Sequence, residues 1–325
     1  MSWNARALDV LAAGPPTPLI DFPLPGTGIR LLLKDESAQP TGSLRHRHAR
    51  ALFRQAVLDG LVTEGTTVVE ATGGNAAVAQ AWFAQRLGLP YIAVMPGARS
   101  QARARAVEAL GGECRFVTPP LAIYDAARRI DGHFLDQFGR AAEHDLAEEL
   151  FGQVRPDWVV TGAGTGATSA TLGGWVRSRG GSCRVVVADP DNSAYFPGWT
   201  LDTPDYATGM PSRIEGIGRP RIEPGFRPDL IDLVIPVPDA ASVAAARQLR
   251  EVTGLPVGGS SGTALWAALE LVERMRARGE TGTVVSLIGD AAERHLATCH
   301  DDEWAAGKGL DAGQFVDELR RRTSV

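Results

Sequence analysis

The chain has 325 residues, of which 44% are hydrophobic and 22% charged, with 37 glycines and 21 prolines. This composition excludes a disordered, collagen-like or coiled-coil protein, and the length favours one large or two closely packed domains. The net charge of -5, the lack of any apolar run near the roughly 20 residues of a membrane span and the lack of a signal-peptide core predict a cytoplasmic protein without nucleic acid or membrane partners.

Short β-branched runs alternate with longer amphipathic stretches along the chain. In chain order, the spacing predicts a strand over Thr66 to Glu70, a helix over Ala76 to Leu87, a strand over Tyr91 to Met95, a helix over Arg103 to Leu110 and strands over Glu113 to Val117, Trp158 to Thr161, Arg184 to Ala188 and Thr283 to Ile288. Repeated strand, turn and helix units favour parallel sheets with helices on both faces. The predicted fold class is therefore α/β.

Ligands in such sheets bind beyond the carboxyl ends of the strands, often against helix N-termini. Glycine-rich turns occupy these places at Thr41 to Ser43, Thr72 to Asn75, Gly162 to Thr168 and Gly258 to Thr263. These turns are where a ligand site is to be sought.

One of these turns is the strongest candidate for binding an anion, and it consists of Gly164, Thr165, Gly166, Ala167 and Thr168. Glycine amides beside two hydroxyls at a helix N-terminus can surround a phosphate. The alternative is a purely structural turn. The turn lacks the lysine of a P-loop and the GxGxxG spacing of a dinucleotide site.

A second turn, formed by Thr72, Gly73, Gly74 and Asn75, could hold a carboxylate by the same physics. Its alternative is an ordinary helix cap, which threonine or asparagine supplies in many proteins.

Charged residues gather at two further places. Arg45, His46, Arg47 and His48 crowd the start of a helix, either as a functional group or as a solvated face. Asp290, Glu293, Arg294 and His295 follow a strand, where acid-base groups and ion-pair networks are both common. The scattered Cys114, Cys183 and Cys299 and the spacing of the histidines predict no disulfide framework and no metal site.

Taken in order, the turns resemble those of the fold type II pyridoxal-phosphate enzymes, the cysteine synthase and cystathionine β-synthase superfamily with the tryptophan synthase β-like fold. The run over Tyr195 to Trp199 and the run over Gly209 to Glu215 resemble the actinobacterial cysteine desulfhydrase branch. The resemblance covers nearly the whole chain. It implies a large domain of residues 1–46 and 151–325, a smaller mobile domain of residues 47–150, and a homodimer.

The resemblance also implies roles for individual residues. The run from Lys34 to Arg47 looks like the stretch that presents the family's Schiff-base lysine, Thr72 to Asn75 like the loop for the substrate carboxylate, and Gly164 to Thr168 like the cup for the cofactor phosphate. The remaining cleft residues that it implies are Ser43, Glu215, Gly216, Ser260, Ser261, Asp290 and Ala291.

The departures from the family pattern carry the functional hypothesis. Arg45 stands where the family places its lysine, and Ala291 where it places a hydroxyl facing the pyridine nitrogen. Gly73 and Ala76 replace hydroxyl residues of the carboxylate loop, and Ala167 replaces a glycine of the cup. Because these changes lie at several distinct positions, natural divergence explains them better than one engineered Lys-to-Arg change.

A guanidinium cannot form the imine on which pyridoxal chemistry depends. Of the 33 basic residues only Lys34 and Lys308 are lysines, and neither falls at the family's position. We therefore expect no covalently bound cofactor, with pyridoxal phosphate held only without a covalent bond.

These expectations lead to a repurposed lyase or transferase that does not use pyridoxal phosphate and acts on a small anionic, amino-acid-like or phosphorylated ligand in the old active-site cleft. Arg45 would clamp the anion, and His46 or His295 would act as general acid or base. One alternative is a non-catalytic protein that binds a ligand or a partner. The other is a pyridoxal-phosphate-dependent enzyme of β-elimination or β-replacement in a Lys-to-Arg form.

Overall fold

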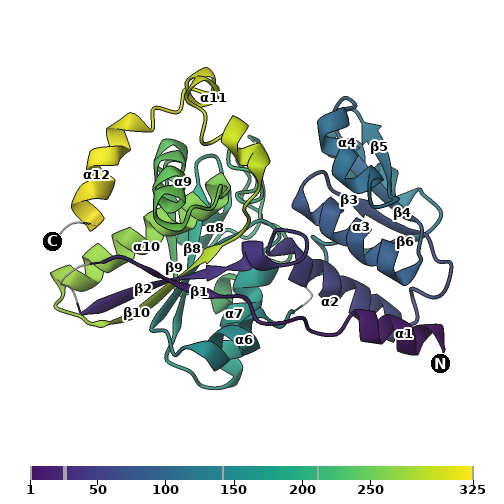
Figure 1. Cartoon of the computed structure of the whole chain (residues 1–325), viewed down its shortest axis with the longest axis horizontal. Coiled ribbons are helices and arrows are strands. Elements are labelled where there is room, and N and C mark those ends of the chain that lie inside the picture. Colours follow the sequence, from purple (N-terminus) through teal and green to yellow (C-terminus); the bar gives the residue numbers. More distant parts are fainter. Residues whose placement is uncertain (1, 25–27, 141–142, 211, 324–325) are drawn as a thin grey trace. The chain divides into compact units, whose positions relative to one another are not determined.

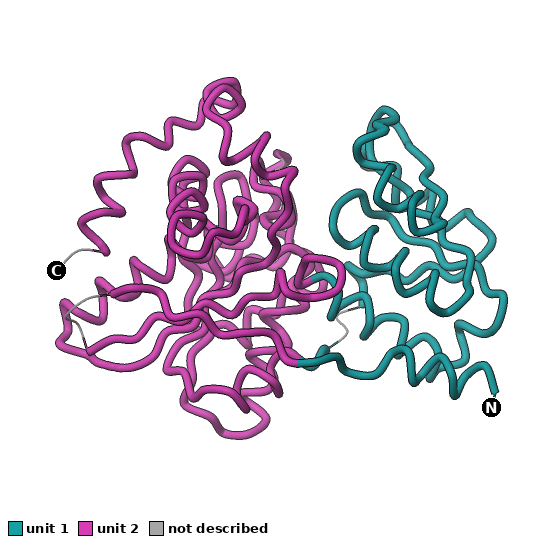
Figure 2. Tube along the Cα trace, viewed as in Figure 1, with its two compact units in different colours: residues 1–15, 45–145 teal, residues 16–44, 146–325 magenta. Residues whose placement is uncertain are grey.

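The computed structural model describes residues 2–24, 28–140, 143–210 and 212–323. Pro211, which belongs to one of the runs that carry the family resemblance, lies outside the described residues. The chain divides into two compact units, a smaller one of residues 1–15 and 45–145 and a larger one of residues 16–44 and 146–325 (Figure 2).

The smaller unit contains a four-stranded parallel sheet with the strand order β5-β4-β3-β6. Its elements are α1 (Trp3–Val10), α2 (Arg45–Leu58), β3 (Val68–Ala71), α3 (Asn75–Leu87), β4 (Tyr91–Pro96), α4 (Gln101–Glu108), β5 (Glu113–Val117), α5 (Ile123–Arg128) and β6 (His133–Phe134) (Figure 1). Helices α1 to α4 pack on one face of the sheet, and α5 packs on the other. This arrangement places Glu70 and the turn over residues 72–74 at the carboxyl end of β3.

Helix α1 belongs to the smaller unit, whereas the expected boundaries placed residues 1–46 in the larger domain. The reason is apolar packing, because Ala7 and Leu11 are buried in the same core as α2 and α3. The indole nitrogen of Trp3 also donates to the carbonyl of Leu87 at 3.2 Å. The mobility of the smaller domain stays a prediction.

The larger unit contains a six-stranded sheet with the order β1-β2-β10-β7-β8-β9, in which β1 is antiparallel to β2 and all other neighbours are parallel. Its elements are β1 (Leu19–Phe22), β2 (Ile29–Asp35), α6 (Leu146–Gln153), β7 (Trp158–Gly162), α7 (Ala167–Ser178), β8 (Arg184–Pro190), α8 (Tyr195–Thr200), β9 (Leu233–Val237), α9 (Asp239–Thr253), α10 (Gly259–Ala277), β10 (Gly282–Ile288), α11 (Asp302–Gly307) and α12 (Gly313–Thr323).

Both faces of this sheet are covered, which explains why the middle residues of its central strands are apolar on both sides. Leu31 and Leu33 of β2 face the core formed with α9, α10 and α12, and Leu32 between them faces the core formed with α6 and α7. The α/β class with parallel sheets flanked by helices is confirmed, and each strand predicted from the pattern is present within two residues at either end. Within the described ranges, no helix combines the length and the apolar character needed to cross a membrane.

Candidate active site

The turn over Gly164 to Thr168 joins β7 to α7 at the carboxyl end of the larger sheet. Gly166 is the N-cap residue of α7 and adopts a φ of 85°, in the left-handed region. A Cβ atom at this position would lie 2.4 Å from the carbonyl carbon and oxygen of Gly225. The backbone of the turn therefore requires glycine here.

One hydrogen bond from outside the turn and one within it fix its conformation. The Tyr195 hydroxyl donates to the carbonyl of Gly164 at 2.6 Å, and Thr165 Oγ1 accepts from the Ala167 amide at 3.3 Å. The amides of a first helical turn and the positive end of the helix dipole favour an anion. The donor set of Gly164, Thr165, Gly166, Ala167 and Thr168 thus suits the phosphate group of a cofactor.

Three separate segments of the larger unit converge at the carboxyl end of β10. The Leu44 amide donates to the carbonyl of Gly289 at 2.8 Å, and the Gly289 amide donates to Ser261 Oγ at 3.0 Å. Ser43 forms an antiparallel bridge with Asp290, and its side chain is fully buried. Among the described residues, Ser43 Oγ has no hydrogen-bond partner.

A histidine, a carboxylate and an arginine form a polar cluster next to this junction. His295 Nε2 lies 2.9 Å from Asp290 Oδ2, and the His295 ring is buried. Arg294 Nη2 donates to the same oxygen at 3.1 Å and lies 3.9 Å from the carboxylate of Glu215. Gly258 leaves the space for this cluster, because a Cβ there would lie 2.4 Å from Asp290 Oδ1.

The other predicted cleft residues of the larger unit lie around these segments. Ser260 is half-buried in the first turn of α10, and Ala291 is half-buried and hydrogen-bonded through its amide to the carbonyl of Gly42 at 3.4 Å. Gly216 lies in an exposed turn with a φ of 88°. The same turn is tied to the strand side of the phosphate cup, because the Gly218 amide donates to the carbonyl of Ala163 at 2.8 Å.

The turn over Thr72 to Asn75 lies in the smaller unit, between β3 and α3. The Thr72 amide donates to the carbonyl of Val94 at 3.0 Å, and Gly74 is the N-cap residue of α3, without a side-chain cap. Gly73 contacts a guanidinium, since a Cβ at this position would lie 2.6 Å from Arg103 Nη2. The turn therefore combines a helix N-terminus with a nearby cation.

Arg45 and His46 form the first turn of α2 in the smaller unit. Arg45 is half-buried. The His46 ring lies 4.8 Å from the ring of Trp82 and 4.6 Å from that of Phe83, centroid to centroid. Burial, together with the charges of Arg50 and Arg47, lowers the pKa of His46 to about 4. His46 is therefore neutral at pH 7, and its role in acid-base chemistry stays a prediction.

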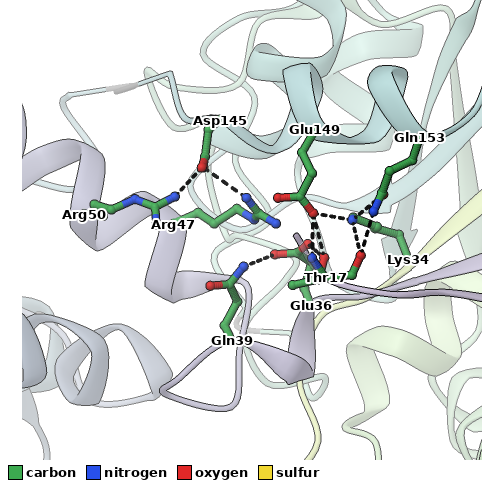
Figure 3. Close-up of polar contacts among 9 residues, drawn as sticks. All are labelled: Thr17, Lys34, Glu36, Gln39, Arg47, Arg50, Asp145, Glu149 and Gln153. Carbon is green, nitrogen blue, oxygen red and sulfur yellow. Dashed lines mark hydrogen bonds and ion pairs between the residues drawn. The ribbon is translucent and has the colours of Figure 1, made fainter. Parts of the chain in front are cut away.

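Further along α2, two arginines share one carboxylate (Figure 3). Arg47 Nη1 lies 3.1 Å from Asp145 Oδ1, and Arg50 Nη2 lies 2.5 Å from Asp145 Oδ2. Burial raises the pKa of Asp145, but the charges of Arg50 and Arg47 outweigh it, so the pKa lies below its usual value. Arg47 can therefore be buried because its charge is paired with that of Asp145.

Lys34, at the end of β2, is fully buried in a polar network of the larger unit (Figure 3). Its amine donates to Glu149 Oε1, to the carbonyl of Thr17 at 2.8 Å and to Gln153 Oε1 at 2.7 Å. Lys308 is exposed at the C-terminal end of α11. Of the two lysine amines of the chain, that of Lys34 is thus part of an internal ion pair, and that of Lys308 lies at the surface.

Two buried carboxyl groups near the glycine-rich turns were not predicted from the sequence. Burial raises the pKa of Glu70, two residues before Thr72, to about 8, although the group accepts hydrogen bonds from the amides of Gln137 and Ala71. Burial also raises the pKa of Asp189, at the end of β8, to about 7. An acidic residue inside an otherwise apolar predicted strand was the available signal for Glu70.

Comparison with known proteins identifies the family. The model of a family described as pyridoxal-phosphate-dependent enzyme matches residues 10–290. The chain belongs to this family.

Individual relatives are similar to the chain over most of its length. The chain is 44% identical over 336 residues to L-cysteine desulfhydrase Cds1 of Mycobacterium tuberculosis, covering 95% of this chain and 91% of the relative. It is 29% identical to a cysteine synthase of Aquifex aeolicus over 83% of each chain. Among solved structures, an O-ureido-L-serine synthase matches with a TM-score of 0.77 and 25% identity, over 93% of this chain and 98% of that one.

These comparisons correct the expectation about the cofactor. We expected no covalently bound cofactor. The family model that matches most of the chain is that of pyridoxal-phosphate-dependent enzymes, so the comparison indicates pyridoxal phosphate as the cofactor. The expectation rested on Arg45, on the lack of a lysine that could replace it, and on the lost polar groups at Gly73, Ala76 and Ala291. Binding of such a cofactor also draws on the donors around its phosphate, and the Gly164 to Thr168 turn retains them.

Proposed function

We propose that this protein is a pyridoxal-phosphate-dependent enzyme that acts on L-cysteine or a closely related amino acid by β-elimination or β-replacement, in a form with arginine at position 45. The observation that carries the proposal is the 44% identity to a cysteine desulfhydrase over 95% of the chain. The family match and the phosphate-binding turn before α7 support it. The alternative of an enzyme without pyridoxal phosphate has no comparable support.

In this proposal each turn has a distinct task. The Gly164 to Thr168 turn holds the cofactor phosphate with backbone amides and the dipole of α7. The Thr72 to Asn75 turn binds the carboxylate of the amino acid. Pyridoxal phosphate, when bound, supplies an electron sink that weakens the bonds at the α-carbon of the amino acid.

The cluster of His295, Asp290 and Arg294 orients polar groups at the end of β10. Asp290 accepts from Arg294 and fixes the His295 ring through its Nε2 atom, so this histidine can hold a proton at a defined position. Ala291 offers no side-chain donor or acceptor to a cofactor ring, which makes the bound ring depend on other contacts.

The first test measures cofactor retention and sulfide release from L-cysteine in the wild type and in Arg45→Lys. After incubation with pyridoxal phosphate and desalting, we expect the wild type to retain the cofactor absorbance. We expect Arg45→Lys to release sulfide about a hundredfold faster or more, because an amine is a nucleophile and a guanidinium is not. Arg54→Lys, at an exposed position of the same helix, is the matched control and should leave the rate unchanged.

The outcomes separate the alternatives. Loss of the cofactor absorbance from both proteins would overturn the proposal. Retention of the cofactor without sulfide release by either protein would favour a non-catalytic binder. A measurable sulfide release by the wild type that Arg45→Lys leaves unchanged would show that position 45 is not where the family places its lysine.

We extend the proposal to a homodimer, as the family resemblance implies. Light scattering of the purified protein should give twice the 34.5 kDa mass of the chain, and the mass of one chain would contradict it.

A further inference from the structure

The guanidinium of Arg103 occupies the place that a side chain at position 73 would take. Arg103 lies in the first turn of α4, and its Nη1 atom donates to the carbonyl of Pro96 at 2.9 Å. A Cβ atom built on Gly73 would lie 2.6 Å from Arg103 Nη2 and 3.2 Å from Pro96 Cδ. Both residues belong to the smaller unit, and Gly73 has no left-handed φ, so its small size serves this contact.

The charge of Arg103 is not neutralised within the part of the chain that the structure describes. Arg99, four residues earlier, pairs with Glu108 at 3.1 Å, but no carboxylate of a described residue pairs with Arg103. The centroid of the Phe116 ring lies 5.6 Å from the guanidinium carbon of Arg103. Nη1 is thus anchored on a carbonyl, while Nη2 is directed at the Thr72 to Asn75 turn.

This arrangement bears on the missing hydroxyl of that turn. Gly73 offers no side-chain donor, and Gly74 caps α3 without a side chain. A guanidinium forms charge-assisted, often bidentate, hydrogen bonds with a carboxylate and restores a donor at the turn. We propose that Arg103 is a substrate-binding residue that contacts the carboxylate of the amino acid at the Thr72 to Asn75 turn, and that Gly73 provides the space for its guanidinium.

The proposal rests on the proposed function for the identity of the ligand, and it predicts a separable effect. Arg103 would act on binding and would leave the chemical step unchanged. In the enzyme loaded with pyridoxal phosphate, Arg103→Ala should raise KM for L-cysteine about tenfold with little change in kcat. Arg105→Ala is the matched control, because Arg105 is an exposed arginine of the same helix, and it should leave both constants unchanged.

A double-mutant cycle with Gly73→Ala tests the contact itself. The new methyl group would displace the guanidinium tip, so Gly73→Ala alone should raise KM by a similar factor. In the Arg103→Ala background the same change should have no further effect. Additive effects of the two substitutions, or an unchanged KM in Arg103→Ala, would overturn the proposal.

Calorimetric titration with L-serine, a non-thiol amino acid, distinguishes failure of the proposed function from failure of this proposal. If the wild type binds L-serine but releases no sulfide from L-cysteine, the reaction is wrong, and about tenfold weaker L-serine binding by Arg103→Ala would still support the contact. Equal binding of L-serine by the two proteins, or no binding by the wild type, would overturn it. Ethanolamine, which lacks the carboxylate, should show no difference between the wild type and Arg103→Ala.

Discussion

The turn before α7 and the turn before α3 both place glycines at the start of a helix, but their glycines face different surroundings. Gly166 is packed against the backbone of Gly225, which leaves no room for a Cβ atom, and its left-handed φ disfavours other residues. Gly73 faces the flexible tip of Arg103. Where backbone atoms surround a glycine, the turn keeps one binding geometry. Where a side chain faces the glycine, that side chain can add its own functional group to the turn.

The two turns should respond differently to the same added methyl group. Gly166→Ala should destabilise the protein by roughly 3 kcal/mol or more, because it adds backbone strain and a collision with backbone atoms. Gly73→Ala should change stability by less than about 1 kcal/mol, because a flexible guanidinium tip has to move and the Pro96 ring has to shift only slightly. Urea unfolding followed by circular dichroism measures both.

The ligand response of the same pair completes this test. Gly166→Ala should lose pyridoxal phosphate on desalting, whereas Gly73→Ala should retain it. Equal losses of stability in the two variants would show that the turns do not differ in the way their surroundings indicate.

A smaller effect concerns pH at the Thr72 to Asn75 turn. Burial raises the pKa of Glu70 to about 8, so its carboxyl group is neutral at pH 7 and ionises at higher pH. The new charge lies about 7 Å along the strand from Thr72 and disfavours a bound carboxylate. The affinity of the wild type for L-serine, measured by calorimetry, should therefore fall about fivefold between pH 7 and pH 9. In Glu70→Gln this fivefold loss should be absent.

The same group affects stability with a definite sign. Because the folded pKa of Glu70 lies above its usual value of 4.5, its stabilising contribution is fully present below pH 4.5 and is lost as the pH rises to about 8. Glu113→Gln, at an exposed position of β5, is the control and should keep the wild-type dependence of unfolding free energy on pH between pH 4.5 and pH 8. If the unfolding free energy of Glu70→Gln depended on pH in the same way as that of the wild type, Glu70 would be excluded as the cause of the pH dependence.

The sequence predicted β7, β8 and β10 of the larger sheet well because strands covered on both faces are continuous β-branched runs. It missed β2, although β2 is not at an edge, because its apolar run consists of leucines between Arg30 and Lys34. It did not indicate β9 by the same pattern, since Pro236 interrupts the run. Pro236 is exposed in an edge strand, where a missing amide is tolerated. Strand β1 carries the exposed Asp21 and is likewise at an edge.

The candidate site was predictable to the extent that it follows the chain locally. The turns over Thr72 to Asn75 and Gly164 to Thr168 each join a predicted strand to a helix, so the sequence places them at sheet ends. The contact of Gly73 with Arg103 joins residues 30 positions apart in the chain through the packing of α4, and no local pattern encodes it. The burial of His46 against two aromatic rings was hidden for the same reason.

The placement of the two lysines has a practical consequence. Lys34 is sealed inside the network of Glu149, Gln153 and Thr17, while Lys308 is exposed at the end of α11. An amine-reactive reagent offered to the folded chain meets one accessible side-chain amine. Lys308 is thus a site on the larger unit at which a single fluorophore could be attached selectively or the protein could be coupled to a surface.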